Sequence, residues 1–589
     1  MDRKAWIAVI LSVVGLIAYY WYTFNESLKH PRPRPVAAQT APGTPTPTPA
    51  NAGTTPGTEV PTAVEAGAPA PVAAKSETLA TDSADYIFSN DAGGIESVAL
   101  TSHLTENGGK VLLNKSRALP IGAIGKTPGE VWGGFELETD SSKGEATFVR
   151  KGQDGLETVK RFVLPARNGK EDAYRVQLDI EFRNTGKEEI AVPDYFVSTG
   201  GAAPIHPNDM PMYTRFDLYH NGKMEGIDVG WFQAFNIPLV GIQWSPEKSI
   251  YEKATPGITW AAVASQYFTT IVTAKNDKGI SVWAKRFPTD NDRRHFGVQG
   301  GLGMPGFKVA AGQTVKQSFL IYSGPKELKR LEELKPVAGG NGGQDSVLNF
   351  GMFWWVSEFL LWGMNTLHGF LHSYAASIIV LTIIIKSLLW PLQNKATNEM
   401  RRMSLLSPKM TELREKFKDD PQKMNEETMK LYREYGVNPL AGCLPMLIQI
   451  PIFFGFYSML GSAIELRNST FFWIRDLSQP DTIAHLPILN FPINLIPIVM
   501  AGTMVWQMAI SPKSGDKMQQ RMMLFMPIIF LVFSYNYASA LALYWTTQNI
   551  FSIVQLYLTR NKPLPTLEKK SVVAKREAVA AQKKKKKRE

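Results

Sequence analysis

The chain has 589 residues, too many for one ordinary domain, so at least two folding units are expected. Its formal net charge of +11 would suit binding to nucleic acid or to an anionic membrane surface, but much of that charge gathers near the C-terminus. The single cysteine, Cys443, excludes an intrachain disulfide and therefore a disulfide-stabilised scaffold.

The N-terminal segment is predicted to cross a membrane. Arg3 and Lys4 precede an apolar run over residues 6–24, close to the roughly 20 residues that a helix needs to span a bilayer. A cleaved signal peptide is the alternative, but it would have a shorter apolar run and a small-residue cleavage site. The aromatic residues 19–22 favour an interfacial belt instead. We therefore expect an uncleaved anchor over residues 1–24.

Residues 25–82 are predicted to form a disordered linker. Most of this segment consists of Pro, Ala, Thr and Gly and contains almost no aromatic residue. Such a composition cannot bury enough apolar surface to offset the entropy lost on ordering.

Residues 83–345 are predicted to form an antiparallel β-sandwich. Apolar and polar residues alternate in short stretches, for example at residues 96–100, 146–149, 174–182 and 280–284, and turn residues separate these stretches.

One segment of this domain, residues 120–127 (PIGAIGKT), approaches the pattern of a phosphate-binding loop. Pro120 replaces the first glycine of that pattern, and Pro128 and Gly129 follow where a helix should begin. Nucleotide binding is therefore not expected.

Residues 346–560 are predicted to be helical and mostly embedded in a membrane. An amphipathic helix over residues 352–371 lies either in the membrane surface or as a lid on the β-domain. The predicted spans are residues 374–392, 444–464 and 486–510, followed by two short helices within 522–558 that turn near 536–539. One helix over that last stretch would be about 55 Å long, against a hydrocarbon core of about 30 Å.

The distribution of Lys and Arg predicts the topology, because positive charge near span ends favours the cytoplasm. With six spans, the loops over residues 393–442 and 511–521 and the basic tail over residues 561–589 share one side with Arg3 and Lys4. With five spans the tail would lie outside. Six spans are therefore expected, with both termini cytoplasmic and the β-domain on the outer side.

A helical hairpin is predicted over residues 393–440. Asp420 followed by Pro421 is typical of a helix start, and it separates two helices with apolar stripes rich in Met. The stripes either pack against each other or, through flexible Met side chains, bind varied apolar partners.

Lys386 is the clearest candidate for a functional residue. It interrupts the apolar run of residues 378–389, and an ammonium near the centre of a spanning helix costs roughly 2.5–3.5 kcal/mol on insertion scales. The alternative is that the Lys386 side chain snorkels. Leu392 lies six residues further along the helix, so the Lys386 stem could approach the cytoplasmic headgroups.

Two further observations favour a wet cavity around Lys386. Gln548, Ser552 and Gln555 recur at helical spacing on the last span, with Asn549 beside them. Gln449 lies on another span. Hydrogen bonding between helices is the alternative for these side chains. No motif of covalent catalysis, metal ligation or cofactor binding is found, so an enzyme is not expected.

The segment 438–453, NPLAGCLPMLIQIPIF, closely resembles the signature at the start of the third span in YidC-family insertases. Leu431-Tyr432, Glu465-Leu-Arg467, Pro391-Leu392 and Met526-Pro527 occur in the family's order, over about residues 351–560. The β-domain resembles the periplasmic domain of Gram-negative members more loosely, through Gly93-Gly94 and Gln266-Tyr267-Phe268.

This resemblance implies a polytopic α-helical protein of the bacterial inner membrane, with a five-helix core beside the N-terminal anchor and a large periplasmic β-domain. The core would hold a hydrophilic groove open to the cytoplasm and the lipid. Lys386 matches the groove's positive residue, most often Arg in relatives, and Gln449, Gln548, Asn549 and Ser552 are expected to line it. Ala441 replaces a usual Gly, and residues 491–495 look like extra length in the fourth span.

The implied activity is the insertion and folding of nascent membrane proteins, alone or with the Sec translocon, in contact with membrane lipids. The basic tail either docks ribosomes or is a solvated segment. A secondary transporter that uses Lys386 is the main alternative, although no internal repeat is evident. A periplasmic binding module with membrane anchors is a second one.

Overall fold

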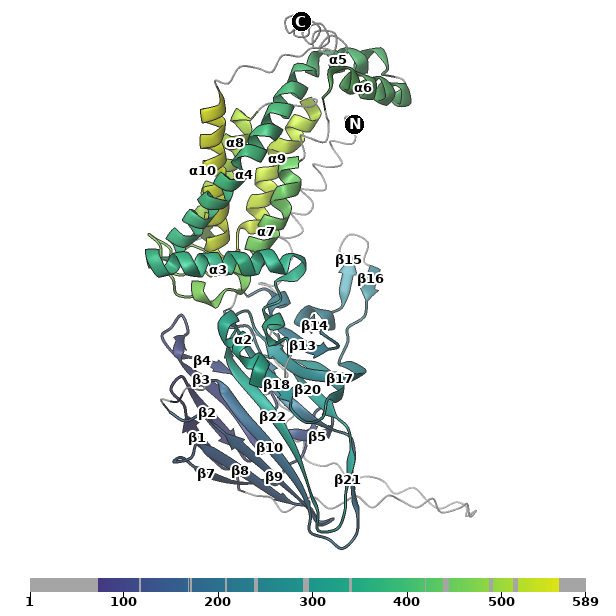
Figure 1. The fold of residues 1–589 in the computed structure, drawn as a ribbon, viewed down its shortest axis with the longest axis vertical. Helices are drawn as coiled ribbons and strands as arrows, with labels where there is room; N and C mark the ends of the chain where they lie inside the picture. Colours follow the sequence, from purple (N-terminus) through teal and green to yellow (C-terminus); the bar gives the residue numbers. More distant parts are fainter. Residues whose placement is uncertain are drawn as a thin grey trace, which may run out of the picture. The chain divides into compact units, whose positions relative to one another are not determined.

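The computed structural model describes residues 73–560 apart from 116–117, 168, 170–171, 207–208, 238–241, 290–295, 338–341, 419, 438–443, 487–490 and 512–516. The expected anchor over residues 1–24, most of the expected linker and the basic tail lie outside the described residues. A β-rich part precedes a helical part in the sequence (Figure 1).

The β-rich part contains two main antiparallel sheets. The smaller one has the order β1-β2-β3-β4, and the larger one, with 14 strands among the described residues, has the order β6-β5-β12-β20-β19-β17-β18-β22-β10-β9-β8-β7, with β13 paired to β17 and β14. The strands of the smaller sheet are β1 (Ser76–Ala80), β2 (Ala84–Ser89), β3 (Gly94–Leu104) and β4 (Lys110–Leu113).

The larger sheet contains β5 (Ile124–Thr127), β6 (Glu130–Val131), β7 (Glu136–Asp140), β8 (Glu145–Lys151), β9 (Leu156–Val163), β10 (Arg175–Asn184), β12 (Tyr195–Ala202), β13 (Arg215–His220), β14 (Lys223–Asp228), β17 (Tyr251–Ala264), β18 (Phe268–Ala274), β19 (Gly279–Pro288), β20 (Phe296–Met304) and β22 (Thr314–Pro325). Short two-stranded pairs are β11 (Ile190–Val192) with β21 (Phe307–Val309), and β15 (Phe235–Ile237) with β16 (Ile242–Ser245).

Aromatic side chains join the two sheets into one core. Phe88 of β2 contacts the rings of Phe148 on β8 and Phe162 on β9, with ring centroids 6.2 and 5.4 Å apart. Buried and partly buried residues alternate along β10, which is the period of a strand with one face on a core. The predicted antiparallel β-structure is therefore confirmed.

The structure defines where the β-domain begins and what residues 124–127 form. Strand β1 lies within residues 25–82, so the β-domain begins before residue 83 and the predicted linker is too long at its C-terminal end. Ile124–Thr127 of the segment that approaches a phosphate-binding loop is a strand, and no helix follows it. A phosphate-binding loop needs a helix after it, so this geometry does not favour nucleotide binding.

Steric crowding explains why glycine occurs at both positions of the pair Gly93-Gly94, which resembles the family's pattern. Gly93 has φ +59°, and a Cβ added there would lie 2.7 Å from the ring of Phe135. A Cβ at Gly94 would lie 2.6 Å from the carbonyl oxygen of Ile121, which pairs with Ile95. Only glycine allows this close approach of two backbones.

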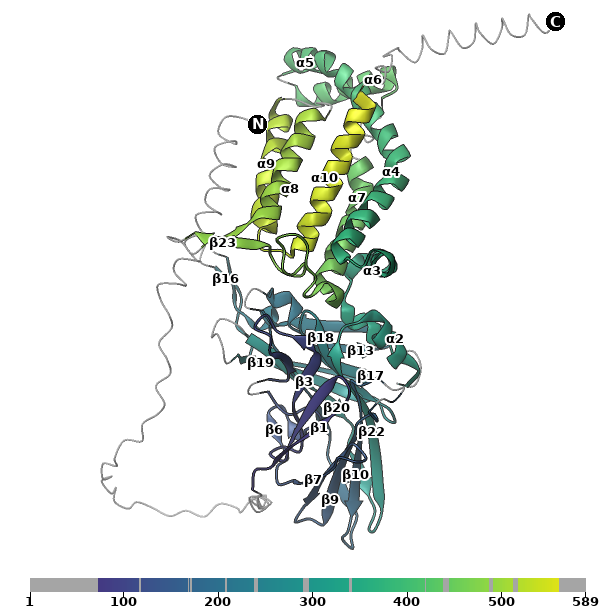
Figure 2. The ribbon, with the colours of Figure 1, turned by 90° about the vertical axis from the view of Figure 1, so that its left-hand side faces the viewer.

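The helical part comprises α2 (Leu328–Val337), α3 (Trp354–Leu371), α4 (Tyr374–Leu405), α5 (Ser407–Lys416), α6 (Pro421–Tyr435), α7 (Leu444–Ser462), α8 (Leu495–Ile510), α9 (Lys517–Ser534) and α10 (Ser539–Arg560). Helices α4, α7, α8, α9 and α10 run side by side, and α3 lies across one of their ends, as Figures 1 and 2 show from two sides. Helix α3 packs against α4 and α7, which favours a surface helix over a lid on the β-domain.

The long apolar stretch near the C-terminus is two helices. Helix α9 ends at Ser534 and α10 begins at Ser539, as helix length alone predicted. The fourth predicted span starts too early, because residues before Leu495 form the hairpin of β23 (Thr482–Leu486) and β24 (Phe491–Asn494). Of the extra length noted at residues 491–495, Phe491–Asn494 is therefore a strand, and Leu495 is the first residue of α8.

The predicted hairpin over residues 393–440 has a different first helix. Helix α4 continues past Pro391 to Leu405, so the hairpin consists of α5 and α6. The Asp420 side chain accepts a 3.0 Å hydrogen bond from the N–H of Lys423, which confirms the predicted helix start. Leu406, Tyr432 and Met410 pack together between the helices, so much of the apolar stripe serves internal packing.

Among the described residues, α4 is the one helix both long and apolar enough to span a membrane by length and composition. Shorter apolar helical stretches cover Ile448–Ser462, Leu495–Ile510 and Phe525–Ser534. The count of six spans therefore stays a prediction.

Candidate functional site

Lys386 lies inside the helical bundle. Helix α4 begins at Tyr374 after Ser373, whose side chain accepts a hydrogen bond from the N–H of Ala376, and it carries Lys386 toward α7. The Lys386 side chain is 5% exposed, and its Nζ donates a 3.3 Å hydrogen bond to Oε1 of Gln449. The ammonium therefore lies among helices instead of extending toward the end of the span.

Gln449 connects three helices. Its Oε1 accepts from Lys386 on α4, while its Nε2 donates to the phenol oxygen of Tyr544 at 3.1 Å and to Oε1 of Gln548 at 3.0 Å, both on α10. The four residues Lys386, Gln449, Tyr544 and Gln548 are called the polar cluster below. Lys386, Gln449 and Gln548 are predicted site residues, and the structure brings these three together.

Tyr544 is the member that the sequence analysis missed. It is buried and its ring stacks on Phe456 of α7, with centroids 4.0 Å apart. Tyr544 precedes Gln548 by four residues, so extending the polar stripe of α10 by one helical turn would have found it.

The other two predicted site residues lie elsewhere. Asn549 is buried, and its Nδ2 donates to Oγ1 of Thr503 on α8 at 3.0 Å and to the carbonyl of Met500 at 3.4 Å. Asn549 therefore bonds two helices together, which is the alternative that the sequence left open. Ser552 is partly exposed one turn beyond Gln548.

The polar stripe of α10 continues to the far end of α4. Gln555 donates from Nε2 to Oδ1 of Asn394 at 3.2 Å, and Arg401 donates to the carbonyl oxygen of Thr559 at 2.9 Å. These contacts and the polar cluster place a row of hydrogen-bonding groups between α4 and α10.

No Asp or Glu of the described residues forms an ion pair with Lys386. Its observed partner is a neutral amide, and a buried charge without an opposite charge is costly to maintain. An arrangement of this kind is suited to receiving water or an acidic group.

The opposite end of α7 meets the β-domain. Nε2 of Gln266 donates to the carbonyl of Gly461 at 3.0 Å, and the phenol of Tyr267 donates to the carbonyl of Ser478 at 3.4 Å. Arg467, also of this region, donates to the carbonyl of Leu104 at 3.0 Å. The tripeptide Gln266-Tyr267-Phe268 therefore lies where the β-domain contacts the helical part.

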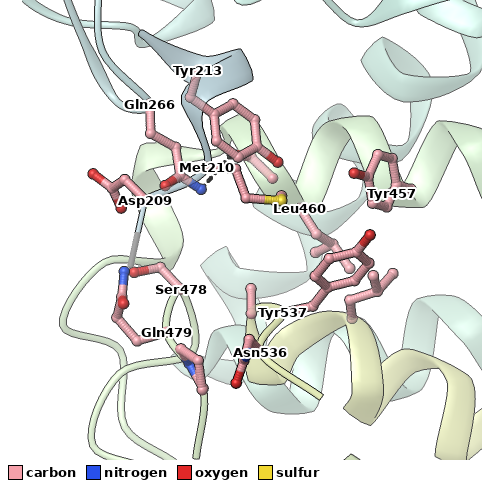
Figure 3. A pocket seen from close by; sticks show the side chains of 14 residues that line it. Asp209, Met210, Tyr213, Gln266, Tyr457, Leu460, Ser478, Gln479, Asn536 and Tyr537 are labelled. Atoms are coloured by element: carbon pink, nitrogen blue, oxygen red, sulfur yellow. Dashed lines mark hydrogen bonds between the residues drawn. The ribbon is translucent and has the colours of Figure 1, made fainter. Parts of the chain in front are cut away.

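A cavity of about 40 Å³ lies at this contact, room for about one water molecule. The rings of Tyr213, Tyr457 and Tyr537 come together around it, from the β-domain, α7 and the turn between α9 and α10 (Figure 3). Burial raises the pKa of Tyr213 above its ordinary range.

Metal chemistry has no candidate in the part of the chain that the structure describes. No group of three or more His, Cys, Asp or Glu side chains there is placed to hold an ion.

Comparisons with known proteins identify the family. A model described as 60Kd inner membrane protein matches residues 366–565, and one described as YidC periplasmic domain matches residues 77–363. The Membrane protein insertase YidC of Citrifermentans bemidjiense is 32% identical over 582 residues, which cover 95% of this chain and 99% of that relative. The chain belongs to the YidC family.

A second YidC relative, from Geotalea daltonii, is 31% identical and covers 96% of this chain and 100% of its own length. The solved structure of an active YidC insertase with its first transmembrane domain resolved covers 83% of this chain at 18% identity. That structure has a TM-score of 0.33.

Membership of the YidC family accounts for both parts of the chain. The β-rich part, with α2 and the first part of α3, matches the YidC periplasmic domain model, and the helices from residue 366 on match the 60Kd inner membrane protein model. Residues 438–443 of the signature, with Cys443 and Ala441, lie outside the described residues, and Leu444 begins α7. The transporter alternative finds no support among these relatives.

Proposed function

We propose that this chain is a membrane protein insertase whose substrates contact the polar cluster. The observation that carries the proposal is Lys386, a buried ammonium whose observed partner is an amide instead of a carboxylate. The relatives named membrane protein insertase YidC support the activity.

The cluster would act by giving polar parts of a nascent segment a partner part-way across the bilayer. Lys386, Gln449 and Gln548 offer hydrogen-bond donors and acceptors. These groups replace part of the water that a hydrophilic tail of the substrate loses when it enters the membrane. The apolar stretch of the substrate then partitions sideways into lipid, which is favourable by about 25 cal/mol per Å² of apolar surface removed from water. No nucleotide is needed for this step.

The expected groove, open to the cytoplasm and to lipid, is part of the proposal. Gln548 and Ser552 are partly exposed on α10, which suits a surface that incoming chains reach. Asn549, which bonds α8, is assigned to holding the groove's wall instead of contacting substrate.

The proposed topology has six spans, cytoplasmic termini and an outer β-domain. The proposed division is an anchor over residues 1–24, a linker from 25, the β-domain to 345, the core over 346–560 with its hairpin, and the tail over 561–589. Protease added outside spheroplasts should cut within residues 31–72 and leave the tail intact. Digestion of the tail from outside would contradict six spans.

Nascent membrane proteins, the Sec translocon, ribosomes and membrane lipids are the proposed partners. The tail's run of Lys583–Lys587 would attract ribosomal RNA through counterion release. Deleting that run should weaken co-sedimentation with ribosomes most at low salt, and an unchanged salt dependence would remove the ribosome from the proposal.

Site-specific photocrosslinking tests the activity most directly. A photoreactive residue at Gln449 or Gln548 should capture stalled nascent membrane proteins, whereas the matched position Asn549, adjacent in sequence but turned to α8, should capture α8 instead. Equal capture at 548 and 549, or none at 449 and 548, would contradict the proposed site.

A further inference from the structure

The loop between α7 and α8 ends in an apolar β-hairpin. Thr482–Leu486 pairs with Phe491–Asn494 in antiparallel register, with Leu486 opposite Phe491. The segment 482–494 contains no Asp, Glu, Lys or Arg. A soluble loop of this length without charge is unusual, because exposed apolar strands promote aggregation.

The hairpin is fixed to the end of α9. Tyr535, which follows α9 directly, donates from its phenol to the carbonyl of Pro492 at 2.7 Å, and its own carbonyl accepts a 2.7 Å hydrogen bond from Nδ2 of Asn494. The ring of Phe491 stacks on the ring of Tyr535, with centroids 5.2 Å apart. Hydrogen bonds and ring stacking thus attach the hairpin to Tyr535, directly after α9.

Three apolar side chains of the hairpin are about half exposed. Ile483, Leu486 and Phe491 are each exposed, Phe491 to 46%. An isolated two-stranded hairpin is marginally stable in water, so this one depends on what lies against it.

A second apolar turn lies in the same loop. Phe472 has φ +49°, a left-handed conformation that is unfavourable for a bulky residue. Its side chain is 84% exposed, so protein contacts recover little of that cost. Nε1 of the neighbouring Trp473 donates to Oδ2 of Asp481 at 3.0 Å, and the same oxygen accepts from the N–H of Ile496 at 2.8 Å, which ties this turn to the start of α8.

The hairpin continues an apolar surface of α9. Ile528, Val532 and Phe533 are exposed along the last turns of α9, and Phe491 follows through its stack on Tyr535. In the proposed topology this surface of α9 faces lipid. Figure 2 shows β23 beside the end of the helices that α3 crosses, on the side away from α3.

We propose that this hairpin, with the Phe472–Trp473 turn, docks on the lipid at the outer interface of the bilayer. The inference rests on the proposed topology, which places the loop between α7 and α8 on the outer side, and goes beyond it. The hairpin's open strand edges need water or headgroups as partners, so it lies at headgroup level and not in the hydrocarbon core. With α3 on the other side, the bundle is held at its outer end by two interfacial elements.

Fluorescence quenching by nitroxide lipids tests the docking. A Cys443→Ser background that retains insertion receives one new cysteine, Phe491→Cys or Leu486→Cys, carrying an environment-sensitive fluorophore. The full-length protein is reconstituted in vesicles of phosphatidylethanolamine and phosphatidylglycerol, with the nitroxide on the headgroup or near the end of the acyl chain. Phe533→Cys on α9 is the membrane control, and Leu112→Cys on β4, exposed in the β-domain, is the aqueous control.

Labels at 491 and 486 should be quenched by the headgroup nitroxide at least about twofold more than the label at 112, and more by that nitroxide than by the one near the chain end. Quenching at 533 but not at 491 or 486 would overturn the docking and leave the topology standing. No quenching at 533 either would overturn the topology as well. Energy transfer between labelled copies, without lipid quenching, would assign the hairpin to a protein contact and also overturn the inference.

Discussion

The β-domain and the helical part place apolar and polar side chains in opposite ways. In the β-domain the large apolar residues are buried, and Leu104, Leu112 and Met212 are its exposed exceptions among the described residues. From Met352 to Leu558 large apolar side chains are exposed along most helices, while Lys386 and Asn549 are buried. The first pattern is what the hydrophobic effect produces in water, and the second suits the lipid available to an inner-membrane protein.

Two buried lysines sharpen this comparison. Lys160 in the β-domain has its Nζ 3.2 and 3.3 Å from the carbonyls of Ala92 and Gly122 and 4.3 Å from the ring centroid of Phe135. Backbone carbonyls and a packed ring are fixed partners, so Lys160 has a structural role. The partner of Lys386 is a side-chain amide that can rotate, which is what a changing substrate requires.

The largest expected effect comes from removing one phenylalanine ring in each of the two parts and comparing the losses of stability. Phe162→Ala should destabilise the β-domain by roughly 3–5 kcal/mol, because it opens a cavity between the sheets. Phe533→Ala, at a side chain that is 70% exposed, should cost under about 1 kcal/mol, since lipid replaces the ring. Hydrogen exchange of the full-length protein, followed in β8 and β9 for Phe162→Ala and in α9 for Phe533→Ala, compares the two losses, and equal losses would contradict the comparison.

The next effect concerns pH. Burial lowers the pKa of Lys160 well below its ordinary value. Above that lowered pKa and up to about pH 10.4 the unfolded chain holds a proton that the folded chain has released, so the free energy of unfolding should rise with pH, by at most about 1.4 kcal/mol per unit. Hydrogen exchange in β9 across this range measures the rise.

Lys160→Met should flatten the rise, whereas the matched change Lys151→Met, at the exposed end of β8, should keep it. A pH dependence that survives Lys160→Met would assign it to another group.

The structure of these two parts can be predicted from the sequence where it depends on residues that are close together in the chain. Alternation gave the strands of the β-domain, and length gave the division into α9 and α10, because both depend on nearby residues. The run before Leu495 is predicted as helix but contains the strand β24, because a continuous apolar run has the same composition in a strand as in a helix.

The polar cluster was predicted in part. Lys386, Gln449 and Gln548 stand out because polar residues are rare in apolar runs. Their mutual hydrogen bonds, and the turn of Asn549 toward Thr503, depend on how three helices pack, which periodicity in one helix does not specify.

A smaller effect tests the division within α10. Asn549→Ala should lower the thermal stability of the helical part by about 1 kcal/mol, because it removes the hydrogen bond to Thr503, and should leave insertion unchanged. Ser552→Ala is the matched control and should leave stability unchanged. If Asn549→Ala slows insertion while stability holds, Asn549 contacts substrate after all.

The measurement that tests the central claim most directly is insertion by Lys386 variants in a depletion strain, with substrates whose translocated tails are acidic or neutral. Lys386→Arg should retain insertion, Lys386→Ala should slow acidic-tailed substrates about fivefold or more, equivalent to about 1 kcal/mol, and Lys386→Glu should slow them further. An Ala variant made at normal levels that inserts every substrate at the wild-type rate would contradict the role of the buried charge.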